Sequence, residues 1–314
     1  MSKLSLRIAV LTYKRPHDIS AVLPLLVDQA REVSSLVGPV DVVVVDNDPE
    51  ASARETVDSI RARQSEAAVF YEHEPRPGIS AGRNRALASA ADHDLLVFID
   101  DDERPCAGWL DALLRTREEM GCAAVVGPVV SEYEIEPDPW IRAGGFFERR
   151  RLPTGTRVDV AATNNLLLDL RTVRQLSLTF DERFGLSGGG DTMFTRSLHA
   201  MGGVLVWCDE AVVVDVVPSA RVTRSWVMRR AFRSGSSWSS TSLQLSSGLA
   251  ARTWMKMALT SRGTVRICAG AGRLVLGLAT ASLRQRARGQ RTIARGAGML
   301  SGAWGYVYSE YRRT

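Results

Sequence analysis

Apolar runs rich in β-branched residues recur through the first 130 residues and alternate with stretches of helical spacing. Two of these runs, VDVVVVD (40–46) and DLLVFID (94–100), are apolar at nearly every internal position instead of at every second one. Strands of this kind are buried on both faces, so helices must cover both sides of the sheet. We therefore predict an α/β fold, a Rossmann-like domain built on a mainly parallel sheet.

Similar patterns continue to about residue 217. We expect strands at 6–13, 40–46, 67–73, 94–100, 123–130, 164–170, 202–207 and 211–217, and helices at 18–36, 50–64, 80–92, 108–120 and 191–201. Residues 131–160 lack a regular pattern. Because sites in parallel sheets gather at the carboxyl ends of the strands, we expect Thr12, Asp46 and the acidic residues after position 99 to lie together.

The distribution of charge divides the chain in two. Residues 221–314 hold 17 lysines and arginines but one acidic residue, a net charge of +16, whereas residues 1–220 hold 23 basic and 34 acidic residues, a net charge of −11. We therefore predict a catalytic domain at 1–220 and a basic, helical C-terminal region at 221–314.

The four cysteines show no CxxC spacing, which favours reduced thiols in the cytoplasm over a disulfide framework or a zinc site. The longest apolar stretch, residues 264–283, is interrupted by Arg266 and Arg273. What remains uninterrupted is shorter than the ~20 residues that a membrane span requires, so no transmembrane helix is predicted.

The segment FIDDDERP (98–105) places four acidic residues directly after a buried strand. In an extended strand end, residues i and i+2 point the same way, so Asp100 and Asp102 are expected to face one object while Asp101 faces elsewhere. Oxygen ligands of this kind suit Mg²⁺ or Mn²⁺ bound together with substrate phosphates. The alternative is a solvated acidic loop that caps the helix beginning near Trp109.

Other nucleotide sites are excluded or weakly supported. No GxGxxG follows the first strand, and no GxxxxGK[ST] motif is present, which excludes a P-loop. A phosphatase with an aspartate nucleophile stays open in principle, but the chain has only three lysines and none is placed to support it.

Several motifs together resemble family 2 glycosyltransferases. They are TYKRP (12–16), EPRPGISAGRNRAL (74–87), FIDDDERP (98–105) and FGLSGGGDTMFTRSLHAMG (184–202), and they occur in the order and spacing of that family. The later stretch 206–235 resembles the exopolysaccharide branch, the bacterial succinoglycan-type glucosyltransferases. The resemblance implies a GT-A fold with a mixed, mainly parallel sheet.

The resemblance also implies a donor site. Thr12 and Asp46 would hold the uridine and its ribose, and Arg83 and Asn84 would lie over the nucleotide. Asp100 to Asp102 match the DxD signature, in which Asp100 and Asp101 belong to the donor site and Asp102 binds the metal. Each residue also has a plain structural alternative, such as an Asx turn at Asp46 or a solvated helix face at Arg83.

Asp191 corresponds to the catalytic base of the family, which takes the proton of the attacking acceptor hydroxyl. The displacement would be direct and inverting, with no covalent intermediate. Relatives usually carry Glu before this Asp, whereas Gly190 stands here. The sequence GGGDT before an apolar helix is also a good helix N-cap, so that reading stays open.

Further site residues are suggested less directly. No histidine occupies the position of the third metal ligand known in relatives, and Asp215 could take that place or be a surface acid on an edge strand. Trp140 could stack on an acceptor sugar, and Asn164 and Asn165 could bind sugar hydroxyls. All three could equally serve the local structure.

The predicted enzyme transfers a sugar from a nucleotide-sugar donor, a UDP-sugar by resemblance, to a glycan or polyprenyl-linked acceptor with a divalent metal. The basic region is expected to lie on an anionic membrane at its cytoplasmic face, with RSWVMRRAFRSG (224–235) as an amphipathic helix. That helix could instead pack on the catalytic domain. An inactive scaffold and a nucleic-acid-binding protein remain alternatives, the latter disfavoured because no nucleic-acid motif is present.

Overall fold

A computed structural model describes residues 3–63, 68–186 and 188–306. Within them, one sheet has eight strands in the order β3-β2-β1-β4-β9-β6-β10-β8. Its strands are β1 (Leu6–Thr12), β2 (Val40–Asp46), β3 (Ala68–His73), β4 (Leu95–Asp100), β6 (Ala124–Val126), β8 (Arg157–Val158), β9 (Asn165–Asp169) and β10 (Leu205–Trp207). Strand β9 runs antiparallel to both neighbours, and β8 to β10, so the sheet is mixed and mainly parallel, as predicted.

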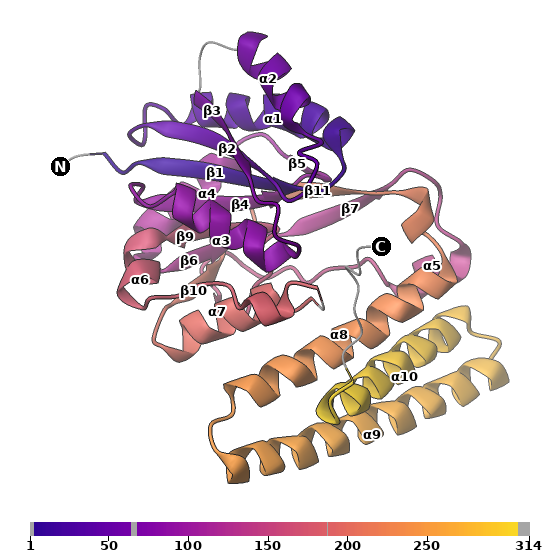
Figure 1. Cartoon of the computed structure of the whole chain (residues 1–314). Coiled ribbons are helices and arrows are strands. Elements are labelled where there is room, and N and C mark those ends of the chain that lie inside the picture. The colour runs from indigo at the N-terminus through magenta and orange to yellow at the C-terminus, as the bar shows by residue number, and fades with distance from the viewer. Residues whose placement is uncertain (1–2, 64–67, 187, 307–314) are drawn as a thin grey trace.

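Helices cover both faces of this sheet (Figure 1). Alternate residues of β1 show why, because Ile8 and Val10 enter one buried cluster and Ala9 enters the other. The first cluster is covered by α1 (Pro16–Glu32), α2 (Arg54–Arg63) and α4 (Trp109–Met120), and the second by α3 (Ile79–Ser89), α6 (Leu170–Gln175) and α7 (Gly190–Ala200). The near-continuous apolar strands of the sequence are therefore buried on both sides.

The predicted strand at 123–130 is wrong as a single element. It divides into β6 in the main sheet and β7 (Val129–Tyr133) in a second sheet, with Gly127 and Pro128 between them. A Cβ added at Gly127 would lie 2.1 Å from the carbonyl oxygen of Ala211, so the chain passes there without room for a side chain. Pro128 also has no backbone N–H to donate to a neighbouring strand, so the hydrogen-bonded pairing of β6 ends before this residue.

The second sheet, of three strands within the described residues, has the order β5-β11-β7, where β5 is Glu103–Pro105 and β11 is Val213–Val217. Because β5 follows the acidic cluster directly, its pairing with β11 places Asp215 opposite Glu103 in the register. This small sheet therefore brings a residue from late in the chain to the end of β4.

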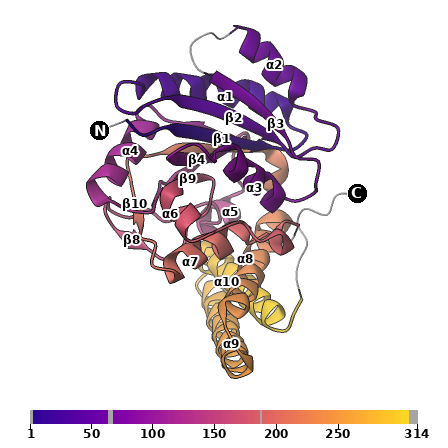
Figure 2. The same ribbon diagram turned by 60° about the vertical axis from the view of Figure 1, so that its left-hand side comes forward.

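Three helices form a layer beyond the sheet: α8 (Arg224–Leu245), α9 (Leu249–Ala279) and α10 (Leu283–Ala303). Figures 1 and 2 show α9 on the outside of the molecule, and α10 contacts both other helices. The basic region is thus helical, as predicted. Among the residues that the structure describes, no helix is long and apolar enough to cross a membrane.

The amphipathic helix predicted at 224–235 forms the first half of α8 but is not free to meet a membrane. Val227 is buried in a cluster with Trp140 of α5 (Pro139–Gly144), and Trp226 packs against the same cluster. The alternative reading, a helix packed on the catalytic part, is the one that the structure shows.

Glycines set the close packing of α9 on α10. A Cβ at Gly270 would lie 2.8 Å from both the Gly289 carbonyl oxygen and a carbon of Ile293, whereas one at Gly272 would meet nothing within 4 Å. We expect Gly270→Ala to lower the free energy of unfolding by about 1–3 kcal/mol through overpacking. The matched Gly272→Ala should raise it by about 0.5–1 kcal/mol, because alanine favours the helix. Urea denaturation measures both, and equal effects would contradict this packing of α9.

Candidate functional site

A cavity of about 760 Å³ opens at the carboxyl ends of β1 and β4. These strands are parallel neighbours, and Leu11 pairs with Asp100 in their register. The carboxyl ends of both strands therefore lie at the same edge of the sheet. Strand β11 and helix α8 supply the opposite wall. Of the predicted site residues, those that line the cavity are Thr12, Arg83, Asp100, Asp101, Asp102, Asn164, Asp191 and Asp215.

All three consecutive aspartates face this cavity. The prediction that Asp101 faces elsewhere assumed an extended chain, but β4 ends at Asp100 and a turn follows before β5. Thr12 Oγ1 donates a hydrogen bond of 2.8 Å to Asp101 Oδ2. The turn therefore breaks the two-residue alternation and brings Asp101 into the site.

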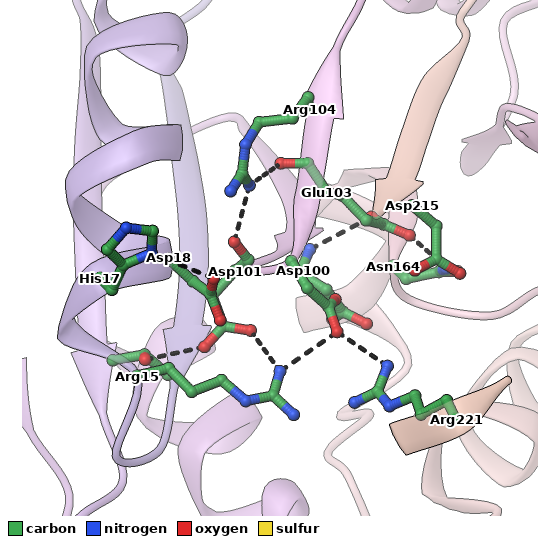
Figure 3. A network of polar contacts seen from close by, with 12 residues as sticks. Arg15, His17, Asp18, Asp100, Asp101, Glu103, Arg104, Asn164, Asp215 and Arg221 are labelled. Atoms are coloured by element: carbon green, nitrogen blue, oxygen red, sulfur yellow. Dashed lines mark hydrogen bonds and ion pairs between the residues drawn. The ribbon is translucent and has the colours of Figure 1, made fainter. Parts of the chain in front are cut away.

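Two arginines neutralise part of this cluster. Arg15 Nη1 donates to Asp101 Oδ1 at 2.9 Å and to Asp102 Oδ2 at 3.1 Å, and Arg221 Nη1 donates to the same Asp102 oxygen at 2.9 Å. Figure 3 shows the two arginines approaching the acidic turn from opposite sides. Arg15 follows β1, whereas Arg221 ends a short 3₁₀ helix just before α8.

Three carboxyl groups of the cluster nevertheless have raised pKa values. Burial, with Asp102 close by, raises the pKa of Asp100 to about 7. Burial raises the pKa of Asp101 to about 6 although Arg15 opposes this, and burial beside Asp100 raises the pKa of Glu103 well above its ordinary value. Glu103 accepts hydrogen bonds from the Asp100 backbone N–H at 3.3 Å and from Asn164 Nδ2 at 2.6 Å. An additional cation bound beside these carboxyl groups would therefore stabilise their ionised forms.

Asp191 lies in the first turn of α7 and lines the cavity. It is not the N-cap, because that position belongs to Gly189 and has no side-chain cap bond. The Asp191 side chain accepts from the Thr192 N–H at 2.9 Å. Packing explains the glycine at position 190, because a Cβ there would lie 2.8 Å from Ser80 Oγ of α3. The glycine lets α7 approach α3 closely.

Asp215 projects from β11 into the cavity wall and pairs with Arg149. Burial raises its pKa, and Arg149 opposes this increase. In the described residues, no group of three or more His, Cys, Asp or Glu side chains is arranged to hold a metal ion. Asp102 pairs with Arg15 and Arg221, and Asp215 pairs with Arg149. In the described residues these two aspartates are thus not part of a preassembled set of metal ligands.

Four predicted site residues lie away from the cavity lining. Asp46 is fully buried and accepts from the Asp48 N–H at 3.0 Å, the Ala53 N–H at 2.8 Å and the Tyr71 hydroxyl at 3.0 Å. Its first bond has the geometry of the Asx turn weighed as an alternative. Asn84 bonds both backbone groups of Phe180.

The other two also serve the structure. Asn165 accepts from Trp109 Nε1 at 2.9 Å and donates to the carbonyls of Pro128 and Ala211. It thereby ties β9 to the two segments that lead from the main sheet into the second sheet, one between β6 and β7 and the other between β10 and β11. Trp140 is 6% exposed, with its ring 4.9 Å from that of Phe146.

The opposite wall of the cavity is formed by Phe147, Arg149, Arg221, Trp226, Arg230 and Arg233, and the sequence patterns did not assign it to the site. Phe147 and Trp226 stack at 5.8 Å, and the Arg230 guanidinium lies over both rings. Burial and the nearby Arg149 lower the pKa of Arg230 to about 10. The signal for this wall is the mixture of aromatic residues and arginines at 224–235, a pattern that is also typical of an amphipathic helix on a membrane surface.

Comparison with known proteins identifies relatives of this chain. Residues 8–169 match the model of glycosyl transferase family 2. The chain is 35% identical over 232 residues to the succinoglycan biosynthesis protein ExoM of Rhizobium meliloti, covering 74% of this chain and 73% of that protein.

Solved structures share the fold at low sequence identity. The mannosyltransferase PcManGT from Pyrobaculum calidifontis, in complex with GDP-Man and Mn²⁺, aligns with a TM-score of 0.62 at 16% identity, over 97% of this chain and 88% of that one. S. aureus TarS 1–349 in complex with UDP-GlcNAc aligns with a TM-score of 0.53 at 16% identity, over 93% and 90% of the two chains. The GT-A fold implied by the sequence motifs is therefore confirmed.

The buried Glu103 carboxyl predicts a measurable pH dependence of stability. Its pKa is raised in the folded protein, so the protonated form is favoured there and stability falls as pH rises above the ordinary glutamate range. Glu103→Gln should remove this loss, so the stability of the variant relative to the parent should be greater at pH 8 than at pH 5. Urea unfolding with EDTA at both pH values measures this.

Glu119→Gln, at an exposed position of α4, is the control for loss of one negative charge. A gap between Glu103→Gln and the parent that stays constant from pH 5 to pH 8 would contradict the burial of a charged Glu103.

Proposed function

The chain belongs to glycosyl transferase family 2, and from that premise we propose that it transfers a sugar from a nucleotide diphosphate to an acceptor hydroxyl by direct, inverting displacement. The observation that carries this proposal is the meeting of Asp102, Asp191 and several arginines in one cavity. Asp102 lies in the turn between β4 and β5 and Asp191 lies on α7, while the arginines include Arg15 after β1, Arg83 of α3 and Arg230 of α8. A diphosphate donor needs positive charge, and an attacking hydroxyl needs a base, within one enclosed space.

The donor diphosphate is proposed to lie between the acidic turn and the arginines around it. Arg15 and Arg221 now pair with Asp102, and donor phosphates would offer them a second anionic partner. Thr12 positions the Asp101 carboxylate through its hydroxyl, and Arg83 reaches the cavity from α3. Asp46 and Asn84 are proposed to act indirectly, by fixing the loop after β2 and the position of α3.

A divalent cation, Mg²⁺ or Mn²⁺, fits the chemistry of this cluster. Burial, together with the neighbouring carboxylates, raises the pKa values of Asp100 and Glu103, and the Asp102 carboxylate is open to the cavity. Magnesium commonly uses one or two carboxylates together with substrate phosphates, so Asp102 suffices as the protein ligand. Bound there, the ion would stabilise the negative charge of the leaving diphosphate. Asp215 is a second candidate ligand if Arg149 turns away.

In the proposed reaction, the acceptor oxygen bonds to the anomeric carbon as the bond from that carbon to the phosphate oxygen breaks. Asp191 accepts the proton of the hydroxyl, and the nucleoside diphosphate leaves. The wall with Trp226, Phe147 and Asn164 is proposed to bind the acceptor, because it offers an aromatic face and an amide. Trp140 is proposed only to support this wall, by packing in the same apolar cluster as Phe147 and Trp226.

Likeness to the succinoglycan biosynthesis protein supports an exopolysaccharide acceptor, such as a growing glycan on a polyprenyl carrier. A UDP-sugar donor is supported by the fold shared with the complex that holds UDP-GlcNAc. We propose that α8 belongs with the catalytic part, although the change in charge falls near residue 220, because its side chains line the cavity.

The base assignment is tested by Asp191→Asn. We expect kcat to fall by about 10²- to 10⁴-fold with nearly unchanged donor affinity, because proton removal is lost and the donor contacts remain. Release of nucleoside diphosphate from a panel of UDP- and GDP-sugars measures turnover. Asp111→Asn, at a surface position paired with Arg115 on α4, is the control. Full turnover in Asp191→Asn would contradict the assignment of Asp191 as the base. A parent that is silent on every donor would instead support the inactive scaffold.

Metal use is tested separately. We expect EDTA to abolish turnover and Mn²⁺ or Mg²⁺ to restore it, while Asp102→Asn loses the additional thermal stabilisation that Mn²⁺ brings to UDP binding. The thermal shift with UDP alone should persist in that variant, since Arg83 and Arg221 remain. An enzyme that turns over fully in EDTA would contradict the role of Asp102.

A further inference from the structure

Helix α9 has one buried face and one bare face. Its buried residues are Leu259, Gly263, Gly270 and Gly277, which mark the side that packs on α10. The opposite side looks away from the molecule, and both views of the fold show α9 as its outermost helix (Figures 1 and 2).

The bare face is apolar and uncharged along the helix. We define it by the residues that helical geometry places opposite the α10 contact: Ala250, Trp254, Met257, Ser261, Val265, Cys268, Gly272, Val275, Leu276 and Ala279. Trp254 is 64% exposed, Met257 60%, Val265 64% and Val275 65%. An added Cβ at Gly272 would meet nothing within 4 Å, so no described residue covers that position. Large apolar side chains exposed in one contiguous stripe mark a surface that binds something.

The charge around this face is of one sign. Residues 224–303, which hold all three helices, contain 14 lysines and arginines and no acidic residue. Arg262 and Arg273 are exposed on α9 beside the edge of the bare face. An apolar stripe flanked by cations is the pattern of a helix that lies in the interface of an anionic bilayer.

We propose that the bare face of α9 binds the surface of an anionic lipid bilayer. A second copy of the chain is a poorer occupant, because it would bring two acid-free basic surfaces together without neutralising either. A nucleic acid would use the arginines but would gain nothing from Trp254, Met257 and the valines. The lipid surface satisfies both features at once, the apolar stripe entering the acyl boundary and the arginines meeting the headgroups.

This inference goes beyond sugar transfer and changes which helix meets the lipid. The 224–235 stretch of α8 faces the cavity through Trp226 and Arg230, whereas α9 lies on the far side of α10 from it. Binding through α9 would leave the cavity and its arginines available to substrate.

Vesicle flotation of the full chain tests the proposal without any substrate. We expect the protein to float with vesicles of phosphatidylglycerol and phosphatidylcholine, and much less with phosphatidylcholine alone. Val265→Glu/Val275→Glu should bind the anionic vesicles at least about tenfold more weakly, because two charges enter the apolar stripe. Both valines are exposed, so circular dichroism and the unfolding midpoint should not change.

The matched control is Leu36→Glu/Met120→Glu, which adds the same two charges at exposed apolar positions outside the C-terminal layer. It should float like the parent. As a second readout, the exposed Cys268 should react more slowly with a water-soluble maleimide when anionic vesicles are present, with the labelled site identified by mass spectrometry.

Three results would overturn the proposal. The parent could fail to float, or the two valine substitutions could leave flotation unchanged, which would reduce the interaction to charge alone. Light scattering could instead show a dimer that Val265→Glu/Val275→Glu dissociates, which would assign the face to a second copy. Donor hydrolysis in detergent-free solution is measured in parallel, so failure of the transferase function is distinguished from failure of lipid binding.

Discussion

The contact of Arg15 and Arg221 with the acidic turn is the interaction on which the site depends. Carboxylates placed together at the end of a buried strand repel one another by several kcal/mol at an effective dielectric of ~20, so a compact fold needs cations beside them. Arg15 comes from the segment after β1, and Arg221 comes from the chain more than one hundred residues after the turn. The acidic turn thus holds the start of the C-terminal layer against the sheet as well as preparing a place for a diphosphate.

The small sheet β5-β11-β7 makes that long-range contact possible. It begins directly after the acidic turn, and β11 ends just before the segment that carries Arg221. Helix α8 then continues along the cavity, where Trp226 and Arg230 meet Phe147. One continuous piece of chain therefore closes the cavity and leads on to α9 and α10, which links the donor site physically to the outer helix that we propose binds lipid.

Local sequence patterns predicted the strands of the main sheet apart from β8, the positions of α1 to α4 and the edge at which β1 and β4 present polar residues. They succeeded because burial on both faces leaves a direct signal in composition. Asp46 and Asn165 show the limit of this reasoning. Both are polar residues at strand ends of the expected site, yet one is hydrogen-bonded by its own loop and the other ties the two sheets together. Whether a polar side chain faces a cavity or a backbone group depends on the neighbours that tertiary packing supplies.

The sequence by itself determined the α/β class, the acidic residues at the end of β4, the family resemblance and the basic character of the last helices, because each depends on adjacent residues. Only the tertiary structure decided that Asp101 faces the cavity together with Asp100 and Asp102, and that Gly190 leaves space for the Ser80 side chain. It also decided that α8 lines the cavity while one face of α9 is exposed. The physical reason is that an amphipathic helix shows which side is apolar but not what covers it. The partner of an apolar stripe, like the partner of a carboxylate, comes from elsewhere in the chain or from outside it.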